Sequence, residues 1–591
     1  MNFSNLRSPA ASVKYRWQLA PADHAKAAGI ARALGTSSIM SLILAQRTSG
    51  DPEEAGRFVR PNLMHLHPPA IMRDLPKAAA RLAKAVREKE KIIVFGDYDA
   101  DGVTATAIML TVLRSLGADV TPYLPSRIEE GYGISQAFVE KVLAEKVSLI
   151  VTVDCGTSEG ENVTRLMQAG IDVIVTDHHE PGDQDLPAAY AVLNPKRRDA
   201  TYPFRDLVGA GVAFKLAWGL CEEIAGSSKV GPEMQETLLK VLPFAAIGTI
   251  ADVATMLNEN RIIVRQGLMR LHKAPPGLLA LLRVAEVNPE RASCRDIAFS
   301  VAPRLNAAGR LGEADLALNI LMENDPARAE ELAKTLDNKN RERQHLCSTT
   351  IKIARELAEK DNVHEKKGAL VLAAEQLHEG VIGIVAGRLA EEYGLPCAVI
   401  SINANGRGKG SARGVAGLNL YAAMDASREF LLSFGGHEQA AGFSIAKENI
   451  PAFREHFVKQ CLLQSQTSDI SPVLNIDCEV TLAEIHDGLL RELESLTPFG
   501  EGNPTPLFLC RRVRITGTPK LIGKEPKQHF AFNAVQNNIG YHAVVYNNLA
   551  PLEQIDQGKK RVWDLVFTVN LNNYFTPPRL ELFVQDMRPS E

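Results

Sequence analysis

The sequence predicts a multidomain α/β protein whose first large domain is built around a parallel sheet. From about residue 76, short apolar runs alternate with helix-like stretches, a pattern typical of βαβ units. Residues 327–360 contain neither glycine nor proline, and their apolar residues recur at helical spacing, which predicts one helix about 50 Å long. The last part of the chain holds five short strand-like runs separated by turn residues, which predicts a small β-barrel. A chain of 591 residues is long enough for several such domains.

Three apolar runs of the first domain each end on or just before an acidic residue. They cover residues 91–95, 148–153 and 171–176. A helix-like stretch at 104–116 follows the first run, and residues 1–75 before it consist of helical and loop segments with several prolines. Parallel sheets bind their ligands beyond the carboxyl ends of the strands. We therefore expect the acidic residues to gather at one edge of the sheet.

The second half of the chain predicts a further α/β domain and the barrel. Strand-like runs at 369–373 and 396–402 flank a predicted helix at 381–393, and the polar stretch 464–471 is typical of a linker. The strand-like runs of the barrel are residues 507–516, 528–535, 539–546, 562–570 and 579–585. The predicted organisation is a lead-in at 1–75, a parallel-sheet domain at 76–323, the long helix at 324–362, a second α/β domain at 363–465 and the barrel at 472–591.

Composition indicates an ordinary soluble globular protein, with 45% apolar and 23% charged residues. The 66 basic and 70 acidic residues give a net charge of −4, so overall charge does not indicate a nucleic-acid partner and any basic surface must be local. The eight cysteines lie far apart without a CxxC pair, which argues against a zinc ribbon or a disulfide framework. Because the sequence shows neither a signal peptide nor an apolar run of membrane-spanning length, we expect a cytoplasmic protein without membrane contact.

Four polar clusters carry candidate metal ligands. They are Asp97, Asp99 and Asp101 in FGDYDADG, Asp154 in VDCG, His178 and His179 in TDHH, and Asp252 in GTIADV. Three carboxylates at alternate positions repel one another strongly unless cations neutralise them. Oxygen ligands with one imidazole suit Mn²⁺, or Mg²⁺ more weakly. Taken singly, each cluster is equally typical of a solvated turn, a calcium loop or a helix cap, but their shared placement at strand ends indicates a metal site.

These motifs and several others resemble one family. GDYDADG, VDCG, TDHH and GTIADV resemble, in the same order, the four motifs of the DHH phosphoesterases. The segments LHEGVIGIVAGRL (377–389), GRGKGSARG (406–414) and GGHEQAAGF (435–443) resemble the DHHA1 domain that accompanies them. APRLNAAGRLG (302–312) and LTPFGEGNPTPLF (496–508) resemble the RecJ family of exonucleases, the second opening an oligonucleotide-binding (OB) barrel. The resemblance spans roughly residues 75–590 and implies a DHH domain, the long helix, a DHHA1 domain and an OB-fold.

The resemblance implies two ions, Mn²⁺ or Mg²⁺, and roles for the clustered residues. One ion is held by Asp101, Asp154, His178 and Asp252, and the other by Asp99 and Asp154, with Asp154 bridging. Some relatives have a histidine four residues before the position of Asp99, where this chain has Phe95, so we expect the second ion to bind more weakly. His179 is expected to stabilise charge on the phosphate or to serve the leaving oxygen. The alternative for His179 is a role in orienting His178.

Other residues are candidates for holding the DNA. Segment 406–414, with Lys409 among its basic residues, is predicted to be a loop whose backbone N–H groups and cations approach a phosphate, although such loops are often plain surface turns. By resemblance, Ser411 and Arg413 hold the DNA 5′ end. The further candidates for this end are Arg304, Asn306, Arg310, His437 and His378. For His378, a structural role at the entry to a helix is an equal alternative.

The predicted barrel combines positive charge with aromatic residues. Its basic run is Arg511, Arg512, Arg514, Lys520, Lys524 and Lys527, and the aromatic residues that follow are Phe530, Phe532, Tyr541 and Tyr546. Basic grooves with aromatic platforms bind single strands without sequence preference. Since most aromatic residues of a barrel belong to its core, we expect only a minority of these to contact DNA.

The function that the resemblance implies is a metal-dependent 5′→3′ exonuclease that hydrolyses single-stranded DNA in repair and recombination, and the polarity rests on the resemblance alone. A small-substrate DHH enzyme would not need a C-terminal barrel of this length. A catalytically inactive DNA-binding member would have lost carboxylates, whereas Asp99, Asp101, Asp154 and Asp252 are all present. The resemblance also implies that the protein acts as a monomer and has a single-strand-binding protein and a RecQ-type helicase as partners.

Overall fold

A computed structural model describes residues 15–127, 130–182, 185–360, 368–467, 473–523, 528–556, 562–572 and 576–590. The chain divides into two compact units. The first unit comprises Arg57–Gln344 and the short segment Thr497–Pro504. The second unit comprises Met1–Gly56, His345–Leu496 and Thr505–Glu591.

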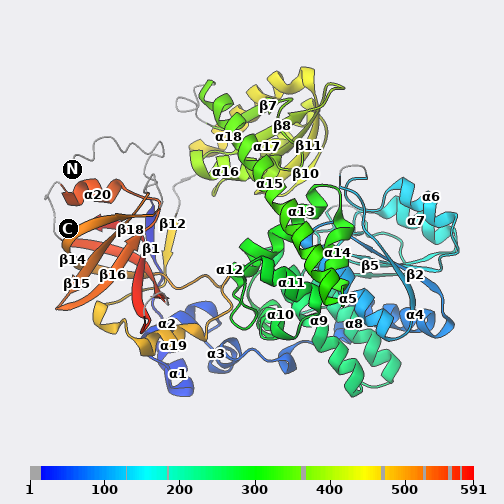
Figure 1. Cartoon of the computed structure of the whole chain (residues 1–591), viewed down its shortest axis with the longest axis horizontal. Coiled ribbons are helices and arrows are strands. Elements are labelled where there is room, and N and C mark those ends of the chain that lie inside the picture. The colour runs from blue at the N-terminus through cyan, green and yellow to red at the C-terminus, as the bar shows by residue number, and fades with distance from the viewer. Residues whose placement is uncertain are drawn as a thin grey trace. The chain divides into compact units, whose positions relative to one another are not determined.

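The first unit contains a parallel sheet with the strand order β3-β2-β4-β5-β6 (Figure 1). Its strands are β2 (Lys91–Gly96), β3 (Asp119–Tyr123), β4 (Leu149–Val153), β5 (Asp172–Thr176) and β6 (Ala191–Leu193). All of β4 is buried, and in β2 and β5 only the first residue is partly exposed, as expected for a parallel sheet covered on both faces. The three strands predicted from the sequence are confirmed, and β3 and β6 add to them.

Helices cover both faces of this sheet. α6 (Gln136–Leu143) and α7 (Gly160–Gln168) pack on one face. The helices on the other face are α4 (Leu75–Glu88), α5 (Ala100–Ser115), α8 (Gly209–Ala225) and α9 (Pro232–Ala251). The unit continues with α10 (Asn258–Leu268), α11 (Pro276–Val284), α12 (Cys294–Asp296), a π-helix at Ile297–Val301, α13 (Ala302–Arg310) and α14 (Ala314–Met322).

The predicted long helix is confirmed as α15 (Pro326–Lys360), which has 35 residues. Its first part contributes Ala329, Ala333 and Leu336 to the core of the first unit. Its last part contributes a second set of buried residues, Cys347, Ile351, Ala354 and Ala358, to a core of the second unit. The helical spacing of apolar residues therefore reflects packing at both ends of the helix.

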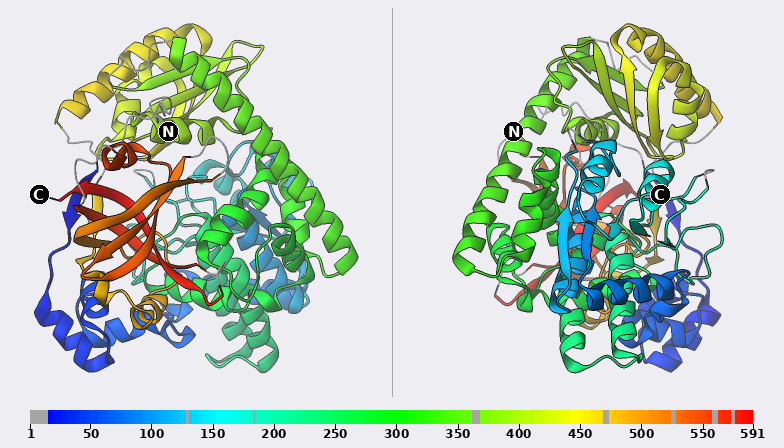
Figure 2. Two further views of the ribbon diagram at one scale, coloured as in Figure 1. Left: turned by 60° about the vertical axis from the view of Figure 1, so that its left-hand side comes forward. Right: turned by 90° about the vertical axis from the view of Figure 1, so that its right-hand side faces the viewer.

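The second unit contains a mixed sheet with the strand order β10-β11-β9-β8-β7. Its strands are drawn in green to yellow at the top of both views of Figure 2. Its strands are β7 (Leu370–Ala374), β8 (Cys397–Ile402), β9 (Arg407–Arg413), β10 (Leu431–Gly436) and β11 (Ala440–Ala446). The helices are α16 (Ile382–Tyr393), α17 (Leu420–Ala426) and α18 (Ile450–Thr467). The prediction of a loop at 406–414 is wrong, because this segment forms β9, whose backbone pairs with β8 and β11 along its length. A backbone N–H cradle is therefore not available there.

The C-terminal part of the second unit is a closed barrel. Its main strands are β14 (Phe508–Ile522), β15 (His529–Gln536), β16 (Ile539–Val545), β17 (Val562–Asn572) and β18 (Arg579–Pro589). The ring closes because β17 pairs with β14 as well as with β18. These strands confirm the five predicted runs.

Regular secondary structure occupies part of the predicted lead-in and part of the predicted linker. β1 (Arg16–Leu19), within the predicted lead-in, pairs in parallel with β12 (Val473–Ile476). The helices α1 (His24–Leu34), α2 (Ser38–Arg47) and α3 (Pro52–Val59) follow it. The predicted linker at 464–471 is partly wrong, because α18 continues through Thr467. Residues 468–471 lie outside the described residues.

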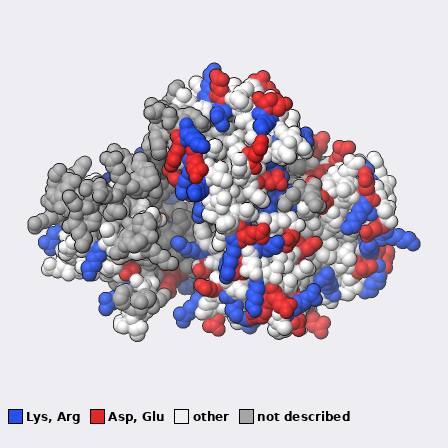
Figure 3. All heavy atoms as spheres, turned by 45° about the horizontal axis from the view of Figure 1, so that its top comes forward, with Lys and Arg blue, Asp and Glu red and all other residues white. Residues whose placement is uncertain are grey.

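Charged side chains of both signs lie on the surface of the protein. On the face drawn in Figure 3, basic and acidic side chains are interspersed, as the net charge of −4 suggests. In the described part of the chain, no single helix is long and apolar enough to cross a membrane, and only the bent pair α1 and α2 would qualify by length and composition.

Candidate active site

The DADG motif forms the first turn of α5, directly after β2. The Asp99 carboxylate caps this helix by accepting hydrogen bonds from the N–H groups of Asp101 and Gly102, at 2.9 and 3.1 Å. A Cβ at Gly102 would lie 2.5 Å from the backbone oxygen of Asp97, so only glycine allows this turn to approach the strand end. The capping interaction explains why α5 begins at Ala100, four residues before the predicted start.

Asp101 is fixed from the opposite side by α8. Its two carboxylate oxygens accept hydrogen bonds from the N–H groups of Gly209 and Ala210 at 2.7 and 2.9 Å. These N–H groups belong to the first turn of α8, where the helix dipole favours a negative charge. A Cβ at Gly209 would lie 2.5 Å from Cβ of Asp154, so this glycine also makes room for the next acidic residue.

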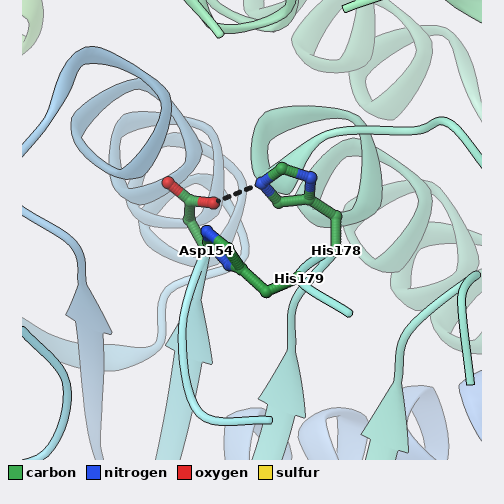
Figure 4. A group of neighbouring side chains, drawn as sticks. All are labelled: Asp154, His178 and His179. Atoms are coloured by element: carbon green, nitrogen blue, oxygen red, sulfur yellow. Dashed lines mark ion pairs between the residues drawn. The ribbon is translucent and has the colours of Figure 1, made fainter. Parts of the chain in front are cut away.

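Asp154, His178 and Asp252 complete the centre of the cluster. Asp154 follows β4 with a φ of +63° and is 2% exposed, and Oδ1 lies 3.0 Å from Nε2 of His178, which follows β5 (Figure 4). The same Nε2 lies 3.8 Å from carboxylate oxygens of Asp101 and of Asp252, at the end of α9. The sheet thus brings together residues that are up to about 150 positions apart in the sequence.

The residues that meet here fit divalent cations. The ligand atoms of Asp101, His178 and Asp252 lie within 4.8 Å of one another, and so do those of Asp97, Asp99 and Asp154. Among the described residues, Oδ1 of Asp97 and Oδ1 of Asp154 are buried without a hydrogen-bond donor. Buried acceptors without donors are costly unless a cation satisfies them. The donor set of oxygens and one imidazole is the set that Mn²⁺ and Mg²⁺ accept.

The electrostatics of the cluster point to the same need for positive charge. Burial, followed by repulsion from neighbouring carboxylates, raises the pKa of Asp97, Asp101 and Asp154. Burial and the charge of Asp99 raise the pKa of Asp252 to about 7. Burial lowers the pKa of His178 to about 3, so its ring is neutral and able to act as a ligand. These carboxylates share a site that is destabilised by their own charge until cations enter.

His179 occupies a different environment from His178. Its Nδ1 lies 2.7 Å from Oδ1 of the buried Asp177 and 3.2 Å from the hydroxyl of Tyr132. Burial opposes the charge on His179, but the hydrogen bond and charge of Asp177 outweigh it and raise the pKa of His179 to about 9. His179 is therefore a cation at neutral pH, held at the edge of the carboxylate cluster.

A cavity of about 360 Å³ opens beside the carboxylates within the first unit. Its lining residues are Asp97, Tyr98, Asp99, Arg127, Tyr132, His179, Ala251, Asn306 and Arg310. Acidic residues thus line one part of the cavity, and two arginines, two tyrosines, His179, Asn306 and Ala251 line the rest. Such a cavity suits a phosphate together with metal ions.

Comparison with known proteins shows which family the chain belongs to. The curated RecJ of Bacillus subtilis, named a single-stranded-DNA-specific exonuclease, is 34% identical over 98% of this chain and 71% of its own length. The RecJ of Dickeya dadantii, with the same name, is also 34% identical, over 80% of this chain and 83% of its own. This chain belongs to the RecJ family. The family models of the DHH family N-terminal domain, the DHHA1 domain and the RecJ OB domain match residues 91–249, 366–463 and 476–586.

Solved RecJ structures support the metal assignment. The crystal structure of Thermus thermophilus RecJ in complex with Mn²⁺ matches this chain with a TM-score of 0.82 and 30% identity, over 98% of this chain and 80% of that one. The structure of the same protein with Mg²⁺ matches with a TM-score of 0.75 and 29% identity, over 98% and 79%. The predictions of a RecJ-type DHH phosphoesterase and of Mn²⁺ or Mg²⁺ as its cofactor are thereby confirmed.

The three candidate residues of the motif at 302–312, which are Arg304, Asn306 and Arg310, lie in three different environments. Arg310 lines the cavity. The side-chain oxygen of Asn306 accepts a hydrogen bond from the N–H of Ala100 at 2.8 Å, so Asn306 also fixes the start of α5. Arg304 instead forms an ion pair with Asp337 at 2.8 Å and donates to the carbonyl of Ser300. Of the two arginines, the geometry favours Arg310 as the phosphate ligand.

Sequence reasoning missed Tyr98, Arg127 and Tyr132 in the cavity. Tyr98 stands inside the quoted motif, but its aromatic ring gave no sign of a site. Arg127 and Tyr132 follow β3, and β3 was not predicted because only one of its five residues, Val120, is buried and because its proline weakens the strand pattern. A prediction of β3 would have placed both residues beyond the carboxyl end of a strand, as for the acidic residues.

In the second unit, Ser411 and Arg413 lie together at the end of β9. The guanidinium of Arg413 donates to the hydroxyl of Ser411 at 2.9 Å. A Cβ at Gly383 would lie 3.0 Å from Nη2 of Arg413 and 3.1 Å from Oγ of Ser411, so the first turn of α16 approaches both side chains closely. A helix N-terminus beside an arginine and a hydroxyl is a suitable environment for a phosphate.

The remaining candidates of the second unit have local contacts. Nδ1 of His378 accepts a hydrogen bond from the N–H of Gly380 at 3.1 Å, in the turn before α16, which supports the helix-entry alternative. His437 is exposed, with Nδ1 at 3.0 Å from the carbonyl of Ala440. Lys409 is half exposed and lies 3.8 Å from Glu379.

Phe95 has a structural role in addition to replacing a histidine. Its side chain is fully buried, stacked on Tyr123 with ring centroids 5.5 Å apart, and packed edge-on against Phe138 at 4.7 Å. In Phe95→His, the histidine would disturb this aromatic cluster, so the substitution would change the packing as well as add a metal ligand. The lower affinity expected for the second ion remains a prediction, and Asp97 is a further acidic side chain near that ion's ligands.

Proposed function

We propose that this protein hydrolyses single-stranded DNA from its 5′ end, using two divalent metal ions, in DNA repair and recombination. The observation that carries the proposal is the cluster of buried carboxylates around His178, in a chain that belongs to the RecJ family. The proposed ligands of one ion are Asp101, Asp154, His178 and Asp252, and those of the other are Asp99 and Asp154. The ions would lower the pKa of water and neutralise charge on the phosphate.

The side chains of the first unit would position and stabilise the reacting phosphate. Asp154 would be shared by both ions, which explains its burial without a hydrogen-bond donor. The His179 cation, oriented by Asp177 and Tyr132, would stabilise the negative charge that develops on the phosphate or protonate the leaving oxygen. Arg310 would hold a phosphate in the cavity by charge-assisted hydrogen bonds.

A direct test of the proposed activity uses long single strands labelled at either end. With Mn²⁺, the 5′ label should appear early as a mononucleotide, while the 3′ label should stay on strands that shorten gradually. A duplex of the same sequence should be degraded far more slowly. Early release of the 3′ label would exclude the proposed polarity, and digestion of a dinucleotide alone would favour the small-substrate alternative.

The 5′ phosphate is proposed to bind at Arg413, Ser411 and the N-terminus of α16. A terminal phosphate carries one more negative charge than an internal phosphodiester, and an arginine that binds it through two hydrogen bonds would favour ends over interior positions. The close approach of Gly383 to both side chains supports a site of this kind.

Arg413→Ala should reduce the preference for a 5′-phosphorylated over a 5′-hydroxyl strand by about tenfold, the effect of losing one charge-assisted hydrogen bond. The measurement is the ratio of steady-state rates on the two strands, for the parent and the variant. Arg413→Lys should restore the ratio only in part, because the planar two-pronged geometry is lost. Arg407→Ala, at the other end of β9, is the matched control. An unchanged ratio in Arg413→Ala would remove this residue from the end-binding site.

The barrel is proposed to bind the strand in a way that depends little on its sequence. Arg512, Arg514 and Lys520 on β14 are exposed, whereas Arg511 is bound to Glu479 at 3.0 Å and lies 3.5 Å from Asp564. Lys524 and Lys527 of the predicted basic run lie outside the described residues. Of the predicted aromatic residues, Phe530 and Phe532 are buried in the core, as expected for most of this set, while Tyr546 is 48% exposed.

The double variant Arg514→Gln/Lys520→Gln should weaken binding to a long strand and reduce the slope of log affinity against log salt by about one to two. Arg511→Gln, whose guanidinium is already neutralised, should change the slope much less. Fluorescence anisotropy at several salt concentrations, with EDTA present to prevent cleavage, measures both. Equal slopes for the parent and the double variant would show that these two residues contact no phosphate.

The family also suggests the context in which the protein acts. We propose that it acts as a monomer in the cytoplasm, with a single-strand-binding protein and a RecQ-type helicase as partners. Eight thiols without a disulfide are consistent with a reducing compartment. Sedimentation would test the monomer, and a pull-down with each purified partner would test the interactions.

A further inference from the structure

The turn that follows Asp252 is strained and weakly held by its own side chains. Val253 has a φ of +56°, a conformation that β-branched residues rarely adopt, and it is 70% exposed. In the described part of the first unit, no group donates a hydrogen bond to the Asp252 carboxylate, whereas Asp99 and Asp101 each accept two. The position of Asp252 therefore depends on the backbone of the turn, which is held by hydrogen bonds from the N–H groups of Val253 and Ala254 to the carbonyls of Ile250 and Thr249, both at 3.2 Å, and by packing beyond the turn.

Segment Thr497–Pro504, which we call the clasp, packs against this turn. It stands between α19 (Asp487–Glu494) and the barrel strand β14 in sequence, but it belongs to the first unit. The carbonyl of Glu501 accepts a hydrogen bond from the N–H of Met256 at 2.7 Å. A Cβ at Gly500 would lie 2.6 Å from Cγ of Met256, and Met256 is itself 2% exposed in the core. The clasp thus contacts the turn four residues after Asp252.

Two arginines of α10 anchor the clasp. Arg261, which is 2% exposed, donates to the carbonyls of Thr497 and Pro498 at 3.0 and 3.1 Å. Arg265 donates to the hydroxyl of Thr497 at 2.7 Å. Inside the clasp, the side chain of Asn503 donates to the carbonyl of Pro498 at 2.8 Å. α10 begins directly after the turn, so the clasp holds both the turn and the helix that leads away from it.

We propose that the clasp positions the metal ligand Asp252 by stabilising the strained turn at 252–257. Its residues are positioning residues, since they contact the turn and not the metal or the substrate. This role explains why the motif at 496–508 combines glycines with Asn503: Gly500 makes room for Met256, and Asn503 closes the segment on itself. The proposal rests on the proposed function only through the assignment of Asp252 as a metal ligand.

Gly500→Ala tests the proposal with a single methyl group. The φ of Gly500 is not positive, so the substitution acts through contact with Met256 and not through backbone strain. Gly160→Ala is the matched control, because a Cβ there has no heavy atom within 4 Å. Calorimetric titration with Mn²⁺ and the melting temperature in EDTA should be measured for the parent and each variant of the full chain.

In Gly500→Ala, the Mn²⁺ affinity of one site should fall about tenfold while the melting temperature in EDTA stays close to that of the parent. Gly160→Ala should keep the parent's affinity. Met256→Ala/Gly500→Ala, which removes the contacting Cγ, should recover part of the Mn²⁺ affinity that Gly500→Ala loses.

Parent affinity for Mn²⁺ in Gly500→Ala, or an equal loss in Gly160→Ala, would overturn the proposal. If Gly500→Ala fails to fold, Thr497→Val decides instead, because it removes the acceptor of Arg265 and changes little in volume; unchanged Mn²⁺ affinity in that variant would also overturn the proposal. If the parent protein binds no Mn²⁺, the proposed function is contradicted. If the parent and the clasp variants bind Mn²⁺ with equal affinity, only the positioning role of the clasp is contradicted.

Discussion

Asp154→Asn should lower the hydrolysis rate by about three orders of magnitude or more, because it removes the carboxylate that the two ions are proposed to share. The side chain is 2% exposed, and its Oδ1 has no hydrogen-bond donor among the described residues. Asparagine keeps the shape but supplies a neutral ligand. The measurement is the single-turnover rate at saturating Mn²⁺, and Asp119→Asn, an exposed acid at the start of β3, is the control.

The same variant should be more stable than the parent when metal is absent. Burial and the nearby carboxylates raise the pKa of Asp154, so the folded state holds the proton more tightly than the unfolded state. The free energy of unfolding of the metal-free protein therefore falls as pH rises through the pKa values of these carboxylates. The pKa of Asp252 is about 7. In EDTA the parent should melt at a lower temperature at pH 8 than at pH 6, and Asp154→Asn should reduce that difference. Hydrolysis by Asp154→Asn at more than a few per cent of the parent's rate would contradict the proposal that both ions share Asp154.

His179→Gln should lower kcat by about 10²- to 10³-fold, the usual effect of losing a general acid or an electrostatic stabiliser. The hydrogen bond with Asp177 helps to raise the pKa of His179 to about 9, so the ring is charged at neutral pH. The contribution of His179 to kcat should therefore be lost as pH rises through about 9. Tyr132→Phe removes one contact with the ring and should have a smaller effect, about tenfold or less.

Metal binding separates the possible roles of His179. A ring nitrogen of His179 lies close enough to Asp154 and His178 for the three to hold one ion, so a ligand role is geometrically possible. If His179 acts on the phosphate, the calorimetric Mn²⁺ affinity of His179→Gln should match that of the parent while kcat falls. A loss of Mn²⁺ affinity in step with kcat would instead show that His179 is a ligand or that it orients His178.

Patterns that repeat locally were predictable from the sequence. The apolar runs at β2, β4 and β5 are buried on both faces of a parallel sheet, so nearly every residue in them must be apolar. The absence of glycine and proline after Pro326 specified α15 for the same kind of reason. The acidic motifs at strand ends also followed, because a parallel sheet places all carboxyl ends at one edge.

Tertiary structure decided what depends on distant partners. Segment 406–414 looks like a loop because it holds four glycines and three basic residues, yet β8 and β11 supply the pairing that makes it a strand, and Gly410 lies against the ring of Phe443. Arg304 and Arg310 stand six residues apart in one motif, but the first forms an ion pair with Asp337, whereas the second lines the cavity.

The sequence by itself determined the fold class and the family, and it indicated the proposed metal ligands, because all three depend on residue types at fixed spacing. Only the tertiary structure showed that His178 is neutral and His179 charged, since the difference comes from burial and from Asp177 and not from the two identical side chains. Only the tertiary structure showed that Thr497–Pro504 contacts the turn after Asp252. No local sequence pattern predicts this contact, because the two segments lie some 240 positions apart. Residue types and their spacing can be seen in the sequence, whereas the charge state of a side chain and its long-range contacts depend on which residues folding brings together.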